Sequence, residues 1–173
     1  MKHARLISIV TVIIVAAIYR ILPHPANVTP VIAVALFSGA KLSDNWQAIF
    51  LPLGIMFVSD VFLGLHNTLA FVYAAIVLTV VIGFYLRKKS SSVVNVFLAT
   101  VLSTALFYIV TNFGVWWVSD FYTPDLNGLI NSYLAGLPFL QKSLMGNLFF
   151  SFIIFAGFHL AEIKFPFIQS RSV

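Results

Sequence analysis

Apolar runs long enough to cross a lipid bilayer follow one another along almost the whole chain, with only short polar stretches between them. A hydrocarbon core of about 30 Å needs about 20 apolar residues in a helix. Hydrophobic residues make up 61% of the 173 residues and charged residues 9%, against about 45–50% and about 25% in soluble domains. The sequence therefore predicts an all-α integral membrane protein with a single transmembrane domain over residues 1–173.

Polar punctuation divides the chain into six predicted transmembrane helices, packed as one compact bundle. They lie at about residues 6–22, 28–40, 47–64, 68–86, 93–118 and 142–161. The second helix is too short to cross the hydrocarbon alone, since a helix rises about 1.5 Å per residue. The preceding turn, LPHPANVTP, must therefore dip into the protein, and irregular backbone at that depth is tolerated where it is packed by protein or lines a wet cavity.

Lysine and arginine are distributed unevenly between the two sides of this arrangement. If the N-terminus is cytoplasmic, eight of the ten fall on the inner side, and only Arg20 and Lys142 fall outside. The inner set is Lys2, Arg5, Lys41, Arg87, Lys88, Lys89, Lys164 and Arg171. Because positive charge marks cytoplasmic loops, both termini are predicted to be cytoplasmic in a multi-pass protein of the bacterial inner membrane. The basic residues form no patch of the kind that binds nucleic acid.

A long outer connection of about residues 119–141 joins the last two predicted helices. Pro124 and Asp125 favour the start of a short helix, which Gly136 and Pro138 would end. Long connections are often lids or binding loops. We expect this amphipathic segment either to cover and gate the mouth of a pocket or to lie in the lipid interface.

Polar and aromatic residues gather on the predicted outer side, and eight of them form the candidate substrate-binding set. These are Arg20, His24, Asp60, His66, Tyr73, Asn112, Trp116 and Tyr133. An ionised carboxylate that faces lipid costs a few kcal/mol, so Asp60 should face the interior or water. It either touches the membrane interface at a helix end or anchors a ligand in a cavity. Arg20 either snorkels to the interface or pairs with Asp60 or a ligand anion.

The two outer histidines and the aromatic motif have competing interpretations. His24 lies between two prolines, so it is either a rigid imidazole able to contact a ligand or an ordinary loop residue. His66 is either a solvated turn residue or a ligand contact. Asn112 and Trp116 lie four apart on one helical face, where an amide and a flat ring suit a planar ligand. The alternative for Trp116 is the aromatic belt at the membrane boundary.

Several catalytic signatures are absent from the sequence. It contains no cysteine, no P-loop, no H-E-x-x-H and no G-x-S-x-G motif. We therefore expect no enzyme activity, no metal centre and no bound cofactor. Ala35 and Gly39 form a small-xxx-small surface that serves either packing inside the fold or docking of a partner.

Four stretches carry a family resemblance: HPANVTPVIAVALFSGA, LPLGIMFVSDVFLGLH, VTNFGVW and GLINSYLAGLPFLQKSLMGNL. They resemble the signature blocks of a bacterial family of uncharacterised six-helix transport proteins, over about Arg20 to Leu148. In size and topology the chain is also similar to the S components of energy-coupling-factor transporters, nearest to the solitary vitamin B12 (BtuM) type.

The resemblance implies a six-helix bundle that captures a vitamin or similar small organic molecule, cobalamin among them, from the outer side. It also implies ECF-type membrane-coupling and ATPase subunits as partners. Cobalamin-binding relatives can use a cysteine to ligate cobalt, so here His24 or His66 would have to serve, or the cobalt would have no protein ligand. The alternative function is a small membrane assembly or interaction subunit without transport activity. Substrate capture predicts a cavity of several hundred Å³ bounded by Asp60 and Asn112, whereas an assembly subunit should fill that space with packed side chains.

Overall fold

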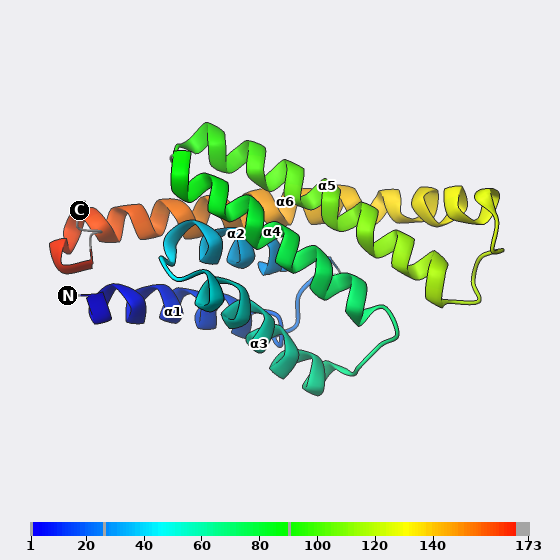
Figure 1. The fold of residues 1–173 in the computed structure, drawn as a ribbon, viewed down its shortest axis with the longest axis horizontal. Helices are drawn as coiled ribbons and strands as arrows, with labels where there is room; N and C mark the ends of the chain where they lie inside the picture. The colour runs from blue at the N-terminus through cyan, green and yellow to red at the C-terminus, as the bar shows by residue number, and fades with distance from the viewer. Residues whose placement is uncertain (1, 26, 90, 169–173) are drawn as a thin grey trace.

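The computed structural model describes residues 2–25, 27–89 and 91–168, and the regular secondary structure in that part of the chain is all helical (Figure 1). Its helices are α1 (Lys2–Ile18), α2 (Val31–Lys41), α3 (Asn45–Leu63), α4 (Leu69–Lys89), α5 (Val93–Val118), α6 (Leu126–Lys164) and a short 3₁₀ turn, η1 (Pro166–Ile168). The prediction of an all-α fold with six helices is confirmed for the described residues, which contain no strand. The helices α3, α4, α5 and α6 are long and apolar enough to cross a membrane, and α1 and α2 are shorter.

The chain runs back and forth between two ends of the bundle. The start of α1, the ends of α2, α4 and α6, and η1 lie at one end, which we call the basic end (Figure 1). The connections 19–30, 64–68 and 119–125 lie toward the other, which we call the loop end. Both described chain termini therefore lie at the same end. Arg171, predicted on the same side, lies outside the described residues.

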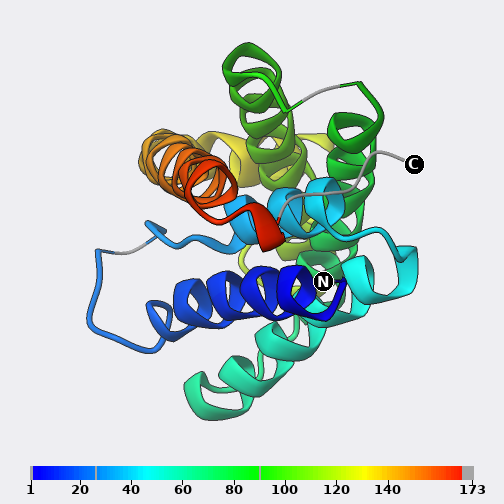
Figure 2. The ribbon, with the colours of Figure 1, turned by 90° about the vertical axis from the view of Figure 1, so that its left-hand side faces the viewer.

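The helix α2 lies at the centre of the bundle (Figure 2). It contacts all five of the other α-helices and packs most extensively against α4. Every residue from Ile32 to Ala40 is buried. With 11 residues it spans only about 16 Å at about 1.5 Å per residue. The turn before it was expected to enter the fold, but it packs there only in part: Pro30 is buried, whereas Leu22, Pro23, Pro25 and Asn27 are exposed.

Two glycines let α2 and α4 touch at the backbone. A Cβ atom on Gly39 would collide with the carbonyl oxygen of Val80, and one on Gly83 would lie 2.6 Å from the carbonyl oxygen of Leu36. Ala35 on the same stretch of α2 is fully buried. The small-residue surface of α2 thus serves packing inside the fold, as small residues do between membrane helices.

Cationic side chains bind the helices together at the basic end. The Arg87 guanidinium donates to the carbonyl oxygens of Leu42 (2.6 Å) and Ser43 (2.7 Å) and to Asn45 Oδ1 (2.6 Å). It therefore satisfies carbonyl groups just beyond the C-terminus of α2 that lack a helical partner. Arg5 of α1 pairs with Glu162 of α6 at 2.6 Å, so the first and last helices are joined there.

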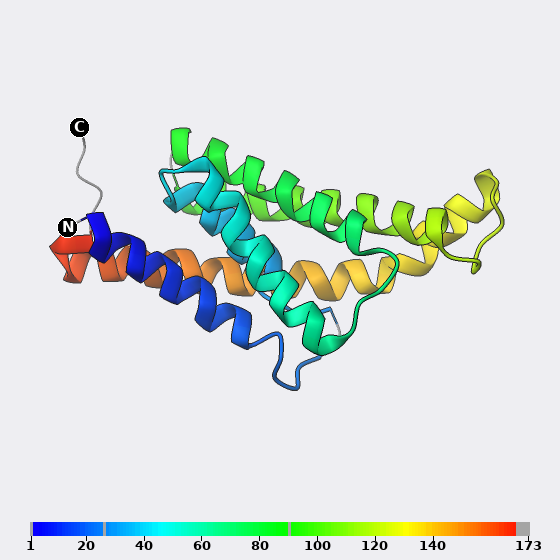
Figure 3. The same ribbon diagram turned by 60° about the horizontal axis from the view of Figure 1, so that its bottom comes forward.

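The helix α6 corrects the predicted boundary at residue 142. It begins at Leu126 and continues to Lys164, with Pro138 inside it, so most of the predicted gating connection is helix. Proline is tolerated inside membrane helices because neighbouring groups can satisfy the freed backbone. Just before this proline turn, the Tyr108 hydroxyl donates to the Tyr133 carbonyl oxygen at 2.5 Å, which ties this part of α6 to α5. The α5–α6 pair consequently extends well beyond the α3–α4 turn (Figure 3).

The start of α6 agrees with the prediction at Pro124 and Asp125. The Asp125 carboxylate accepts a hydrogen bond from the Gly128 backbone N–H at 2.7 Å and another from the Thr123 hydroxyl at 2.8 Å. These bonds, the Gly128 N–H first, lower the pKa of Asp125 below its usual value because they favour the charged form. The cap therefore stabilises the helix fully above the unfolded-state pKa of about 3.9 and is lost as pH falls through the lower folded-state pKa.

The α2–α4 backbone contact predicts a specific sensitivity to added volume. We expect Gly39→Ala to lower the free energy of unfolding by about 1–3 kcal/mol, because the new methyl group meets rigid backbone and not a mobile side chain. Gly157→Ala is the matched control, since nothing lies near its Cβ position, and it should be neutral or slightly stabilising. Thermal unfolding of the purified variants measures both, and equal melting temperatures would contradict the close crossing.

Candidate functional site

Three of the predicted site residues form one buried cluster, which we call the Asp60 cluster: Arg20, Asp60 and Tyr73. Arg20 Nη2 lies 2.6 Å from Asp60 Oδ1, and the Tyr73 hydroxyl donates to Asp60 Oδ2 at 2.7 Å. The Asp60 side chain is only 1% exposed. Its two oxygens thus have partners from the 19–30 connection and from α4, and its charge is neutralised inside the protein.

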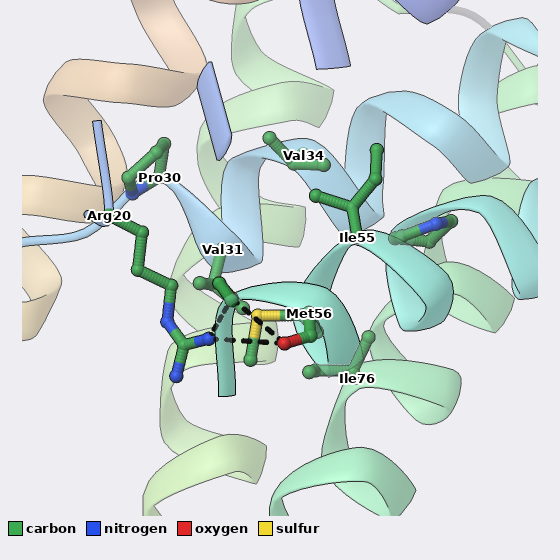
Figure 4. Close-up of a pocket in the computed structure, with 9 residues that line it drawn as sticks. Arg20, Pro30, Val31, Val34, Ile55, Met56 and Ile76 are labelled. Atoms are coloured by element: carbon green, nitrogen blue, oxygen red, sulfur yellow. Dashed lines mark hydrogen bonds between the residues drawn. The ribbon is translucent and has the colours of Figure 1, made fainter. Parts of the chain in front are cut away.

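Arg20 of the Asp60 cluster also lines a cavity too small for an organic ligand (Figure 4). Arg20 also donates to the Ser59 hydroxyl and to the Met56 carbonyl oxygen. The cavity between these groups and the start of α2 has a volume of about 20 Å³ and is otherwise lined by apolar side chains. That is room for about one water molecule. The cluster therefore ties the 19–30 connection to α3 and α4, and the carboxylate of Asp60 is enclosed.

A larger cavity lies between α5 and α6, and we call it the α5–α6 hollow. Its volume is about 320 Å³, and its lining combines neutral polar residues with aromatic and apolar ones. The lining residues are Asn27, Thr104, Phe107, Tyr108, Thr111, Asn112, Gly136, Phe139, Leu140 and Ser143. Among the predicted site residues only Asn112 belongs to this set.

Close contacts between α5 and α6 bound the hollow on two sides. Toward the loop end, the Asn112 amide lies directly against Gly136, where any Cβ atom would collide with it. Toward the basic end, Asn147 Nδ2 donates to Thr104 Oγ1 at 3.1 Å, and beyond it Thr100 donates to Ser151 Oγ at 3.0 Å. The helices separate between these two contacts, and the 19–30 connection contributes Asn27 to the wall.

The other predicted site residues lie outside both cavities. His66 is exposed, with Nδ1 2.8 Å from Thr68 Oγ1, and His24 Nδ1 lies 2.6 Å from the Leu22 carbonyl oxygen. Trp116 Nε1 donates to the Thr123 carbonyl oxygen at 3.0 Å. The Tyr133 hydroxyl donates to the Ile109 carbonyl oxygen at 3.1 Å. The structure thus brings Arg20, Asp60 and Tyr73 together and places Asn112 in a separate site.

The sequence predictions missed most of the residues that line the hollow. Thr104, Tyr108 and Thr111 recur every three or four residues on α5, and Ser143 lies four residues before Asn147 on α6. Polar residues at helical spacing in two apolar segments were the available signal. No group of three or more histidine, aspartate or glutamate side chains that could hold a metal ion occurs in the described part of the chain.

Residues 1–168 match DUF6580, a family of unknown function, and the chain belongs to that family. No curated protein and no solved structure matches it.

The Asp60 cluster predicts non-additive effects of substitution. Arg20→Met or Asp60→Leu alone should lower the free energy of unfolding by about 3–5 kcal/mol, because each leaves a charge buried without its partner. The double variant should lose much less than the sum, since it removes both charges together. Unfolding of the purified variants in a denaturing-detergent titration measures the cycle, with Asp120→Leu as an exposed acidic control. Simple additivity would contradict a buried pair.

Proposed function

We propose that this chain is a multi-pass protein of the bacterial inner membrane that captures a small organic molecule from the outer side. The α5–α6 hollow is the binding site, and the role is like that of an S component. The observation that carries the proposal is the volume of the hollow, about 320 Å³, since small-molecule sites run from about 300 to 1,000 Å³. A few fixed polar groups among aromatic walls are also typical of such sites.

Charge distribution supports the orientation. Arg5, Lys41, Arg87 and Lys164 come from elements that meet at the basic end, and positive charge favours the cytoplasmic side. The loop end then faces the outer medium, and six segments cross or enter the membrane. In this orientation the 19–30 connection, which contributes Asn27 to the hollow, lies on the side from which the ligand arrives.

The size of the hollow limits the size of the ligand that it can hold. Its volume of about 320 Å³ corresponds to about ten water molecules at about 30 Å³ each. A vitamin or other molecule of that size fits without movement of the helices, whereas cobalamin is a far larger macrocycle and would need α5 and α6 to separate. Capture of this kind is passive, so coupling and ATPase subunits of the ECF type remain the proposed partners for inward transfer.

The alternative, an assembly or interaction subunit, has its own supporting observation. Trp117, Phe121 and Leu126 are 66%, 85% and 70% exposed near the tip of the α5–α6 pair, where another protein could cover them. That function gives no reason for an open space between α5 and α6. The two proposals therefore differ in whether filling the hollow abolishes activity.

A hollow-filling substitution tests the capture proposal. Ser143→Phe places a ring in the hollow and should weaken binding of a small aromatic probe, benzamide, by about tenfold or more, since the lost contacts are worth at least about 1.4 kcal/mol. Met145→Phe is the matched control, because Met145 is 75% exposed on the same helix. Ligand-observed saturation-transfer NMR on protein in lipid nanodiscs gives the affinities. Equal binding by both variants would place the probe outside the hollow.

Single cysteines test the orientation, and the chain contains none of its own. Asn67 is exposed in the turn between α3 and α4, and Gln47 is exposed at the start of α3. We expect a membrane-impermeant maleimide to label Asn67→Cys in intact cells and Gln47→Cys only after the membrane is opened. The opposite pattern would reverse the proposed topology, because these two positions lie at opposite ends of α3.

A further inference from the structure

The side chains that line the α5–α6 hollow include no aspartate, glutamate, lysine, arginine or histidine. The buried carboxylate of Asp60 is engaged by Arg20 and Tyr73 in the other cluster. Lys142 precedes a lining residue in the chain, but it is exposed and does not line the hollow. An ion that entered the hollow would therefore lose water without gaining an opposite charge.

Unpaired charge is costly at such a site. An ion taken out of water loses several kcal/mol of solvation unless a counter-charge and hydrogen bonds replace it. Inside a membrane protein the same cost makes charged groups pair or face water-filled space. A neutral lining thus discriminates against anions and cations alike, whereas a polar but uncharged molecule loses only hydrogen bonds that the wall can replace.

Three side chains of α5 offer acceptor oxygens to the hollow, beside the donor groups of Asn27 and Ser143. Asn112 Nδ2 donates to the Tyr108 carbonyl oxygen at 2.8 Å, which leaves its Oδ1 to accept from a ligand. The Thr111 hydroxyl donates to the Phe107 carbonyl oxygen at 2.7 Å, so its oxygen also remains as an acceptor. The Tyr108 hydroxyl donates its proton to the Tyr133 carbonyl oxygen, so its own oxygen is also left as an acceptor. A ligand that offers N–H or O–H donors complements these oxygens.

Aromatic side chains supply the apolar part of the wall. Phe107, Tyr108 and Phe139 all line the hollow. Phe107 and Phe139 make no ring contact with another aromatic side chain of the described residues. A flat ring in the ligand can therefore pack against them in stacked or edge-on geometry.

We propose that the α5–α6 hollow selects an uncharged molecule that combines a flat ring with an amide-like donor edge, and that Asn112 reads that edge. This selectivity rests on the proposed function, because it concerns the ligand of the same site. It adds that neither an anion nor a cation is the natural cargo, and it assigns a specificity-determining role to one residue.

Three probes with the same ring test the selectivity: benzamide, benzoate and benzamidinium. In nanodiscs of zwitterionic lipid, benzamide should bind the wild-type protein about tenfold or more tightly than either ion, since a mismatch of about 1.4 kcal/mol is tenfold. Ser143→Phe should abolish the difference by removing binding at the hollow. If benzoate or benzamidinium binds as tightly as benzamide and Ser143→Phe blocks it, capture stands and neutral selectivity is overturned. If no probe binds in a way that Ser143→Phe blocks, the capture proposal itself fails.

Substitution of Asn112 tests the assigned role. Asn112→Asp places an isosteric negative charge in the wall and should reverse the preference, so that benzamidinium binds at least about tenfold more tightly than benzamide. Asn131→Asp makes the same change at an exposed position of α6 outside the hollow and should leave the wild-type order. If Asn112→Asp does not fold, Asn112→Leu replaces it: loss of the amide with similar side-chain size should weaken benzamide several-fold while Met145→Phe does not. An unchanged order of probes in folded Asn112→Asp, or unchanged benzamide affinity in Asn112→Leu, overturns the assignment.

Discussion

The short central helix α2 is the constraint on which the rest of the bundle depends. An 11-residue helix cannot reach both surfaces of a bilayer, so at least one of its ends falls short of the water that would satisfy its backbone. The protein meets this demand by surrounding α2 with every other α-helix and by bringing the Arg87 guanidinium to the carbonyl oxygens beyond its C-terminus. The Gly39–Gly83 crossing then sets how closely α4, and with it α5, can approach.

The α5–α6 interface combines two roles that compete in a membrane. Hydrogen bonds such as Thr100 to Ser151 and Asn147 to Thr104 hold the helices together where lipid offers no hydrophobic drive for association. The same residue types line the hollow where the helices part. Because hydroxyl groups can bond to their own helix, as Thr111 does to Phe107, the wall stays satisfied with no ligand bound.

Much of the fold followed from the sequence because bilayer thickness fixes helix length. The predicted fifth helix, 93–118, matches α5, and the second helix is short, as predicted. The turn before it enters the fold only in part, since Leu22, Pro23, Pro25 and Asn27 are exposed. The prediction for the last helix was wrong because Gly136 and Pro138 were interpreted as a stop. That interpretation holds in water but not in a membrane helix, where neighbouring groups can satisfy the freed backbone. Most of the connection predicted at about residues 119–141 is therefore the first part of α6.

The candidate site was less predictable than the fold. Pairing of Arg20 with Asp60 was one of several alternatives, because Asp60 demands a partner wherever it is buried, but sequence does not say which cation reaches it. Asn112 was identified by its chemistry, whereas Tyr108 and Thr104 resemble ordinary packing residues until the separation of α5 and α6 is known. Trp116 shares a helical face with Asn112, yet its indole is held by Thr123, a contact made only when the connection folds back.

Because the lining of the hollow is uncharged, the membrane potential should have little effect on binding there. A charge that crosses the bilayer field exchanges about 2.3 kcal/mol with every 100 mV of membrane potential. An uncharged ligand bound among uncharged side chains gains or loses no such energy. The internal Arg20–Asp60 ion pair adds no net charge to the protein. If the hollow binds the uncharged ligand that we propose, its occupancy should not depend on the membrane potential.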